Sequence, residues 1–172
     1  MFDRDLTEAD LSSFNAHRLR LMEEHQRIEH LVKKYRALMP TIESHWDLTA
    51  NAIQHNDIQP EVIDAGINIY TCSMTDFWQG IYEPSIYEGN TLWSNKHDRR
   101  KIARVIESWE AGLKLSPVYL VKHLTKDFGL IADGKHRLTV ARYIKATDFP
   151  FMVKTLDSGW VSKVFPAAKL IL

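Results

Sequence analysis

The sequence predicts a mixed α/β fold of the α+β class with a helical extension at the amino terminus. Residues 7–39 carry apolar side chains at helical spacing, whereas residues 95–156 read in the order helix, strand, strand, helix, strand. With 172 residues, 45% of them hydrophobic, the chain is long enough to bury a core. We expect residues 1–75 to form the helical extension and residues 76–172 to form the α/β domain.

In the amino-terminal helix, Thr7 and Asp10 resemble a capping box, and Pro40 would end the helix. One stripe of positions three to four residues apart is mostly apolar, with Phe14, Leu21, Ile28, Val32, Tyr35 and Met39. Arg18 and His25 interrupt this stripe. The stripe either forms a coiled-coil seam, which would make the protein a homodimer, or packs on the chain's own domain, and the polar interruptions favour the second reading.

Two segments follow with different patterns. Residues 41–55 are expected to form a second helix, and Pro60 to open a shorter helix through Ile69. The apolar stripe of the second helix would consist of Ile42, Trp46, Thr49 and Ile53. Residues 76–95, DFWQGIYEPSIYEGNTLWSN, show no period, which predicts an irregular segment that either covers the core or binds a partner. Its aromatic side chains include Trp78, Tyr82, Tyr87 and Trp93.

The pattern sharpens from residue 95. A helical stripe, which Gly112 would end, consists of Ile102, Val105, Ile106 and Trp109. Residues 117–123 and 128–132 read as two strands joined by a turn, and residues 149–156 read as a third strand. The helix that precedes the third strand has Leu138, Ala141 and Ile144 on its apolar face.

A compact charged cluster lies in IADGKHRLTVARYIKA, residues 131–146. Asp133 is expected to cap the following helix with its carboxylate, and Gly134 allows a tight turn. Lys135, His136 and Arg137 then place cationic groups in the first helical turn, where the helix dipole disfavours them. An anion at this position would resolve the conflict, because backbone N–H groups, the dipole and three side chains would converge on a phosphate.

These charged side chains allow a second interpretation. The cluster could instead extend into solvent or pair with acids such as Glu83 or Glu88. The preceding helix also carries a group of basic residues: Arg99, Arg100, Lys101 and Arg104. We expect this group to be a solvated helix face balanced by Glu107 and Glu110 rather than a nucleic-acid surface.

The composition excludes several classes of protein. The 22 Lys and Arg residues equal the 22 Asp and Glu residues, which argues against binding nucleic acid through bulk charge. Cys72 is the only cysteine and the histidines lack ligand spacing, so neither a disulfide framework nor a protein metal site is expected. The acidic start without an apolar signal core, and the lack of a run of ~20 apolar residues, predict a cytoplasmic protein that spans no membrane.

Four segments together resemble the ParB/sulfiredoxin-like superfamily over about residues 80–155: RRKIARVIESWEAG, SPVYLV, GLIADGKHRLTVARYI and TDFPFMV. In that superfamily a strand ends in a G-x-x-R or D-G-x-H-R turn that opens a helix, and the start of this helix binds nucleotide phosphates. Members include CTP-hydrolysing ParB partition proteins, sulfiredoxins, free-serine kinases and fertility-inhibition proteins of the Osa type. The resemblance implies phosphate contacts from Gly134, Lys135, His136 and Arg137. It also implies that Asp133 caps the turn or helps to hold Mg²⁺, and that Glu83 is a catalytic or metal-positioning acid.

The chain departs from two branches of that superfamily. Lys135 stands where sulfiredoxins carry their catalytic cysteine, so sulfinic-acid reduction is not expected. Only 16 residues follow Leu156, too few for the helix-turn-helix of chromosome-partition ParB proteins, so operator binding is not expected either.

The resemblance therefore implies a nucleotide-dependent enzyme. It would bind ATP or another nucleoside triphosphate with Mg²⁺ and hydrolyse it or transfer its phosphoryl group, with Glu83 and His136 as catalytic residues. The alternative is a plasmid- or phage-type effector that acts through a protein partner or as a nuclease. The partner would bind the amino-terminal helices or residues 76–95.

Overall fold

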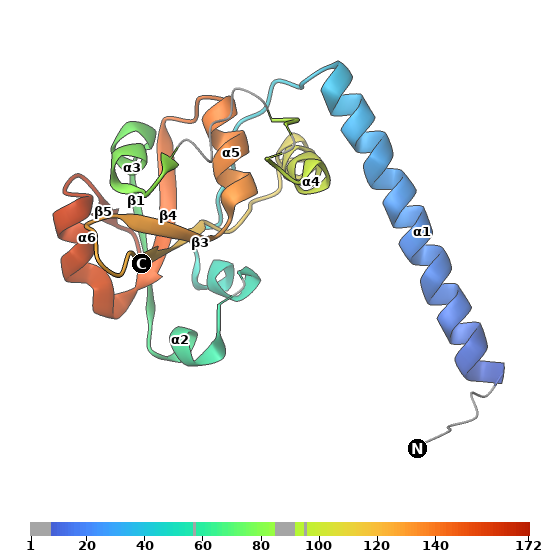
Figure 1. The fold of residues 1–172 in the computed structure, drawn as a ribbon, viewed down its shortest axis with the longest axis horizontal. Coiled ribbons are helices and arrows are strands. Elements are labelled where there is room, and N and C mark those ends of the chain that lie inside the picture. Colours follow the sequence, from blue (N-terminus) through green and yellow to red (C-terminus); the bar gives the residue numbers. More distant parts are fainter. Residues whose placement is uncertain (1–7, 57, 85–91, 95) are drawn as a thin grey trace.

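A computed structural model of the chain describes residues 8–56, 58–84, 92–94 and 96–172. It confirms the α+β class: a five-stranded mixed sheet is covered by helices, and a long amino-terminal helix lies at one side (Figure 1). The strands are β1 (Ile67–Ser73), β2 (Val118–Lys122), β3 (Gly129–Asp133), β4 (Asp148–Lys154) and β5 (Lys169–Leu170). Their order in the sheet is β3-β2-β4-β1-β5, with β2 parallel to β4 and the other neighbours antiparallel.

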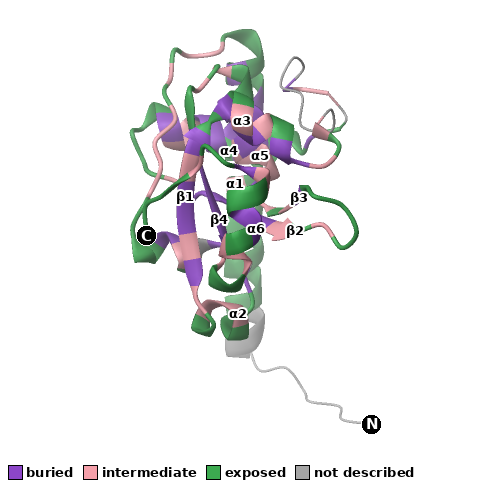
Figure 2. Ribbon diagram, turned by 90° about the vertical axis from the view of Figure 1, so that its left-hand side faces the viewer, coloured by how far each residue is buried: buried purple, intermediate pink, exposed green. Residues whose placement is uncertain are grey.

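Helices cover both faces of this sheet. The α-helices are α1 (Glu8–Ala37), α2 (Pro60–Asp64), α3 (Met74–Gly80), α4 (Arg99–Glu110), α5 (Lys135–Tyr143) and α6 (Ser158–Val164). The 3₁₀ helices are η1 (Ala50–His55) and η4 (Thr155–Asp157). The larger apolar core lies under α3, α4, α5 and α6, and a smaller one joins the opposite face of the sheet to the segment around η1 and α2 (Figure 2). Among the described residues, no helix is both long enough and apolar enough to cross a membrane.

The elements expected from residue 95 onward are confirmed. Asp98 caps α4 by accepting hydrogen bonds from the backbone N–H groups of Arg100 and Lys101, and the expected apolar stripe of α4 is buried. Gly112 follows α4 with a φ of 70°, a left-handed conformation that favours glycine. The strands β2, β3 and β4 and the helix α5 lie where their sequence patterns place them.

The helix expected over residues 41–55 is wrong for residues 41–49. This segment instead passes beside the chain at Leu115, with backbone hydrogen bonds of 2.9 Å from Asp47 N to Leu115 O and from Leu115 N to His45 O. Trp46 packs edge-on against two distant rings, with centroids 5.2 Å from Trp109 and 5.3 Å from Phe149. These long-range contacts outweigh the helical spacing of the segment, and only Ala50–His55 form a 3₁₀ helix.

The short helix expected from Pro60 through Ile69 begins at Pro60 as predicted, but its expected end is wrong. The helix α2 ends at Asp64, Gly66 turns the chain with a φ of 98°, and the next seven residues form β1. Their sequence, INIYTCS, is rich in β-branched and aromatic residues and pairs with β4. Because β1 lies between β4 and β5, the boundary expected between residues 75 and 76 does not separate the sheet from the helical extension.

The segment expected to be irregular, residues 76–95, begins with a helix. Asp76–Gly80 belong to α3, because Ser73 Oγ accepts a hydrogen bond from the backbone N–H of Asp76 and so caps the helix. Tyr87 and Glu88 lie outside the described residues.

The long amino-terminal helix is confirmed, and its carboxyl-terminal half packs on the chain's own domain. Ile28, Val32 and Tyr35 are buried there, and Tyr35 Oη donates a hydrogen bond of 2.5 Å to Glu110 on α4. The amino-terminal half extends away from the domain (Figure 1), with Phe14 and Leu21 63% and 58% exposed. Thr7 of the expected capping box lies outside the described residues.

Candidate functional site

The charged cluster lies where β3 leads into α5. Gly134 precedes the helix with a φ of 90°, and α5 begins at Lys135. No side chain caps this helix among the described residues, so the expected cap by the Asp133 carboxylate is wrong. Gly134 is buried, and a Cβ atom there would lie 2.8 Å from Arg137 Nη2 and 3.1 Å from Val118 Cα. The turn therefore requires glycine for both its conformation and its close packing.

Arg137 holds this turn together. Its guanidinium donates to Ser116 Oγ at 2.6 Å and to Asn56 Oδ1 at 2.7 Å. It also donates to Asp133 Oδ2 at 3.0 Å. The Asp133 carboxylate therefore binds Arg137 instead of capping the helix. The Arg137 side chain is only 13% exposed. The structure thus engages both terminal nitrogens of Arg137 with protein partners, unlike the phosphate contact expected of it.

His136 lies between α5 and the start of α4. Its Nε2 accepts a hydrogen bond of 3.3 Å from the backbone N–H of Asp98, so the neutral ring carries its proton on Nδ1. Burial lowers the pKa of His136 to about 4, and the nearby charges of Lys135 and Lys101 act in the same direction. At neutral pH, His136 is therefore an uncharged hydrogen-bond donor rather than a cation or a strong base.

A cavity of about 470 Å³ lies between α4 and the start of α5. From α5 and the turn before it, the cavity is lined by Asp133, Gly134, His136 and Arg137. Its other lining residues are Lys101, Arg104, Val105, Ser108 and Leu115. Lys101 and Arg104 were expected to be part of a solvated face, but the fold brings both beside the charged cluster. Their spacing of three residues, which places both on one face of α4, is the only signal of this in the sequence.

The basic residues of α4 are balanced mainly by acids of α1. Arg99 and Arg100 both pair with Glu29, at 3.2 and 2.8 Å, and Arg104 pairs with Glu24 at 3.0 Å. For Lys101, no ion pair occurs within the part of the chain that the structure describes. The expected balance by Glu107 and Glu110 is wrong, because these acids pair with Arg27 and Lys34 of α1. Arg99, Arg100 and Arg104 therefore contribute to the contact between two helices.

Glu83 lies at the other end of β3. Ile81 forms an isolated bridge with Gly129, and Tyr82 N donates to Gly129 O at 2.8 Å, which fixes the chain just before Glu83. Gly129 begins β3 and Asp133 ends it, a separation of roughly 13 Å along a strand. The structure therefore does not bring Glu83 to the charged cluster, although it does bring Asp133, Gly134, Lys135, His136 and Arg137 together.

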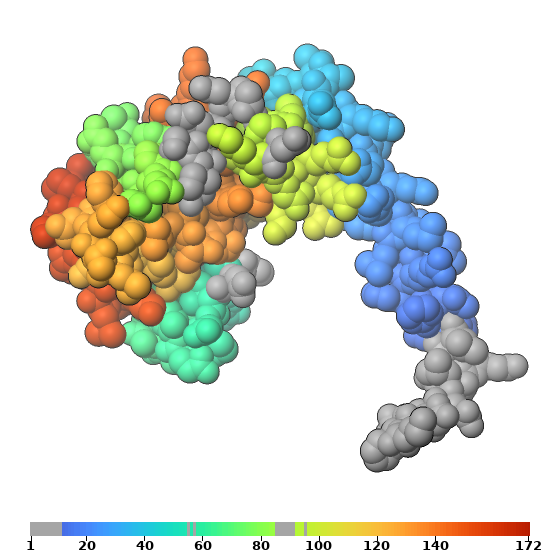
Figure 3. Space-filling model, in the orientation of Figure 1, coloured from blue at the N-terminus to red at the C-terminus, as the bar shows by residue number. Residues whose placement is uncertain are grey.

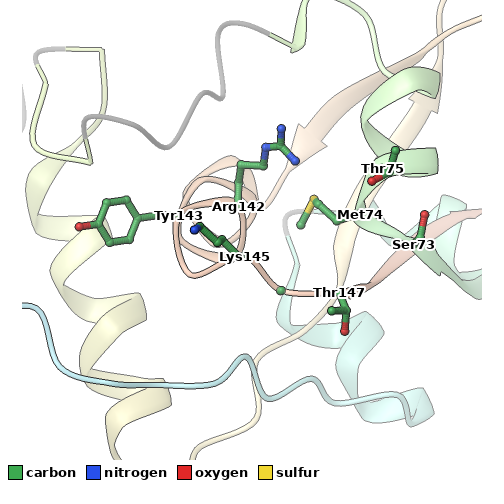
Figure 4. A pocket seen from close by; sticks show the side chains of 8 residues that line it. Ser73, Met74, Thr75, Arg142, Tyr143, Lys145 and Thr147 are labelled. Carbon is green, nitrogen blue, oxygen red and sulfur yellow. The ribbon is translucent and has the colours of Figure 1, made fainter.

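A larger cavity, of about 930 Å³, lies at the opposite end of α5 (Figure 4). Arg142, Tyr143 and Lys145 line it from the end of α5, and Ser73, Met74 and Thr75 line it from the start of α3. The Arg142 guanidinium lies over the Trp78 ring at 4.6 Å. Because the carbonyl end of a helix attracts cations, an anion is less favourable here than at the amino end.

The lowered pKa of His136 predicts a dependence of stability on pH. The unfolded chain binds a proton at His136 near the ordinary pKa of 6.5, whereas the folded chain does so only near 4, so this stability is complete above 6.5 and is lost as the pH falls from 6.5 to 4. Because the ring is partly exposed and solvent screens it, we expect a loss of only about 1 kcal/mol from this group.

Chemical denaturation of the wild-type chain and of His136→Gln at pH 7 and pH 4.5 measures this effect. The unfolding free energy of His136→Gln should fall less than that of the wild type. Equal losses in the two proteins would show that His136 is freely protonated in the folded chain.

The arrangement at the start of α5 is suited to an anion. Gly134 and His136 at the amino end of α5 line one cavity together with Lys101 of α4, so backbone N–H groups, a neutral imidazole and an ammonium group are contributed by one small set of residues. Among the described residues, no group of three or more His, Cys, Asp or Glu side chains is arranged to hold a metal ion. Comparison of the chain with protein-family models, curated proteins and solved structures finds no match.

Proposed function

We propose that the chain binds the phosphates of a nucleoside triphosphate in the cavity between α4 and the start of α5. The observation that carries this proposal is the position of Lys101 and Arg104, which line the same cavity as Gly134 and His136 at the amino end of α5. Helix amino ends with nearby cations are typical phosphate sites, because the N–H groups and the dipole both favour negative charge.

The proposal agrees with the resemblance to the ParB/sulfiredoxin-like superfamily, which we retain as a proposal. The order α4, β2, β3, α5, β4 and the D-G-K-H-R turn at a strand-to-helix junction support it. The phosphate contacts that we propose are Lys101, Arg104, Gly134, Lys135 and His136. Arg137 instead positions the turn.

Mg²⁺ would accompany the triphosphate. Magnesium is usually held by phosphate oxygens together with one or two carboxylates, and Asp133 is the carboxylate among the residues that line the cavity. We assign this binding to the cytoplasm, where nucleoside triphosphates are supplied.

A chemical step is the further part of the proposal: hydrolysis of ATP or a related nucleotide, or transfer of its phosphoryl group. His136 could donate its Nδ1 proton in a hydrogen bond to the transferred group, which stabilises charge without acting as a base. Glu83, at the far end of β3, is not placed to orient the nucleophile. Binding is therefore supported by more of the geometry than catalysis is.

A second candidate function is an effector that binds a protein partner. The observation that favours it is the projecting half of α1, which exposes four large apolar side chains by half or more: Phe14, Leu19, Leu21 and Met22. Figure 3 shows a broad hollow between this half of α1 and the rest of the protein, with α4 at its closed end. If Leu21→Ala abolished binding of a protein partner but left nucleotide binding unchanged, the effector function would be favoured.

The test of the proposed site compares two lysines that line the cavities beside opposite ends of α5: Lys101 of α4 and Lys145, which follows α5. Lys101→Ala should weaken the binding of Mg·ATP by about tenfold, as the loss of a charge-assisted contact would. Lys145→Ala removes the same charge beside the larger cavity and should change the dissociation constant less than twofold. Titration calorimetry measures both. An equal loss in the two variants, or a larger loss in Lys145→Ala, would contradict the site.

A further inference from the structure

Arg104 takes part in two arrangements at once. Its side chain lines the cavity at the start of α5, and its Nη2 lies 3.0 Å from Glu24 Oε1 on α1. Glu24 also accepts two hydrogen bonds from Arg27, of 2.8 and 3.1 Å, and Arg27 reaches Glu107 on α4. Glu24 would therefore keep a cationic partner if Arg104 left it, so the release of Arg104 leaves no unpaired carboxylate.

We infer that Glu24 sets the affinity of the cavity by competing with the ligand's phosphates for Arg104. This inference rests on the proposed function. In the structure Arg104 is held by Glu24, and a polyphosphate would gain Arg104 only by displacing that carboxylate. The Arg104 side chain is 54% exposed, so it is free to turn between two partners on either side of α4.

The ion pairs that Glu29 makes with α4 do not involve a residue of the cavity. Glu29 pairs with Arg99 and Arg100, and neither arginine lines the cavity. Glu23, next to Glu24 in the chain, is exposed and has no ion pair within the described part of the chain. Glu23 and Glu29 therefore serve as controls. Removing either charge tests whether negative charge on α1 affects binding in general, without a competition for Arg104.

Binding and helix contact are linked in both directions. If Glu24 opposes the ligand, the ligand must weaken the contact between Glu24 and Arg104 by the same factor. The apolar contacts of Ile28, Val32 and Tyr35 would still hold the rest of α1 on the domain. The middle of α1, around Glu24, is thus the part whose contact with α4 the ligand would weaken.

The experiment measures the binding of inorganic triphosphate at fixed ionic strength. Glu24→Gln should tighten binding about threefold, in line with an exposed ion pair, whereas Glu23→Gln and Glu29→Gln should change it less than 1.5-fold. In the Arg104→Gln background, Glu24→Gln should have no effect, because the group for which the two anions compete is gone.

Two results would overturn the inference. Equal tightening in all three glutamate variants would indicate a general charge effect, and tightening that persists with Arg104→Gln would exclude competition for that residue. Both results leave the proposed function intact. No binding of triphosphate or Mg·ATP by any variant would instead overturn the proposed function together with this inference.

Discussion

Gly134→Ala should lower the free energy of unfolding by about 3 kcal/mol. The residue has a φ of 90°, and the added Cβ would lie 2.8 Å from Arg137 Nη2, 3.0 Å from Arg137 Nε and 3.1 Å from Val118 Cα. Backbone atoms of β2 cannot move away without disturbing the sheet, and Arg137 cannot move without losing its partners. Denaturant unfolding followed by circular dichroism measures the loss.

Two other glycines serve as matched controls. Gly112 has a φ of 70° and open space around its Cβ position, so Gly112→Ala should cost only the conformational strain, about 1 kcal/mol. Gly159, within α6, has neither a positive φ nor a close neighbour, so Gly159→Ala should be neutral or stabilising by up to about 1 kcal/mol. Equal effects of Gly134→Ala and Gly112→Ala would show that the turn is not packed as described.

Arg137→Gln should lower the free energy of unfolding by about 2–4 kcal/mol. The change leaves Asp133, Ser116 and Asn56 without the guanidinium that joins them, in a region where Ser116 and Asn56 are buried. At a temperature where the variant remains folded, it should bind triphosphate within about threefold of the wild type, because both terminal nitrogens of Arg137 already bind protein partners.

Arg142→Gln is the matched control for Arg137→Gln. Arg142 lies on the same helix, is exposed, and contacts the face of Trp78, so its loss should cost about 1 kcal/mol or less. A folded, stable Arg137→Gln protein that no longer binds triphosphate would contradict the structural role of Arg137. It would support instead the phosphate contact that the superfamily resemblance implies for this residue.

The fold could be predicted from sequence where local pattern decides it. The helix α4, the strands β2, β3 and β4, and the helix α5 all have clear periodicity, and Gly112 marks the end of α4. The predictions were wrong where contacts with residues far away in the sequence determine the local structure. The strand β1 pairs with β4, about eighty residues away, and Trp46 is fixed by Trp109 and Phe149 rather than by its neighbours in the chain.

The candidate site, too, could be predicted only where neighbouring residues determine it. The location of the cluster at a strand-to-helix turn, and the need for Gly134, follow from five consecutive residues. The role of Arg137 does not, because it depends on Asn56 and Ser116, which are 81 and 21 residues away. Lys101 and Arg104 were missed as site residues because their spacing places both on one face of α4 but does not tell that this face lies beside the start of α5.

The most direct test of the account is a crystal structure of the chain with Mg²⁺ and a non-hydrolysable nucleoside triphosphate. We expect the phosphates to lie between Lys101 and the backbone N–H groups at the start of α5, with Nδ1 of His136 donating to a phosphate oxygen and Arg137 still bound to Asp133. Phosphates beside Arg142 and Lys145 at the other end of α5, or no bound nucleotide at millimolar concentration, would contradict the central claim.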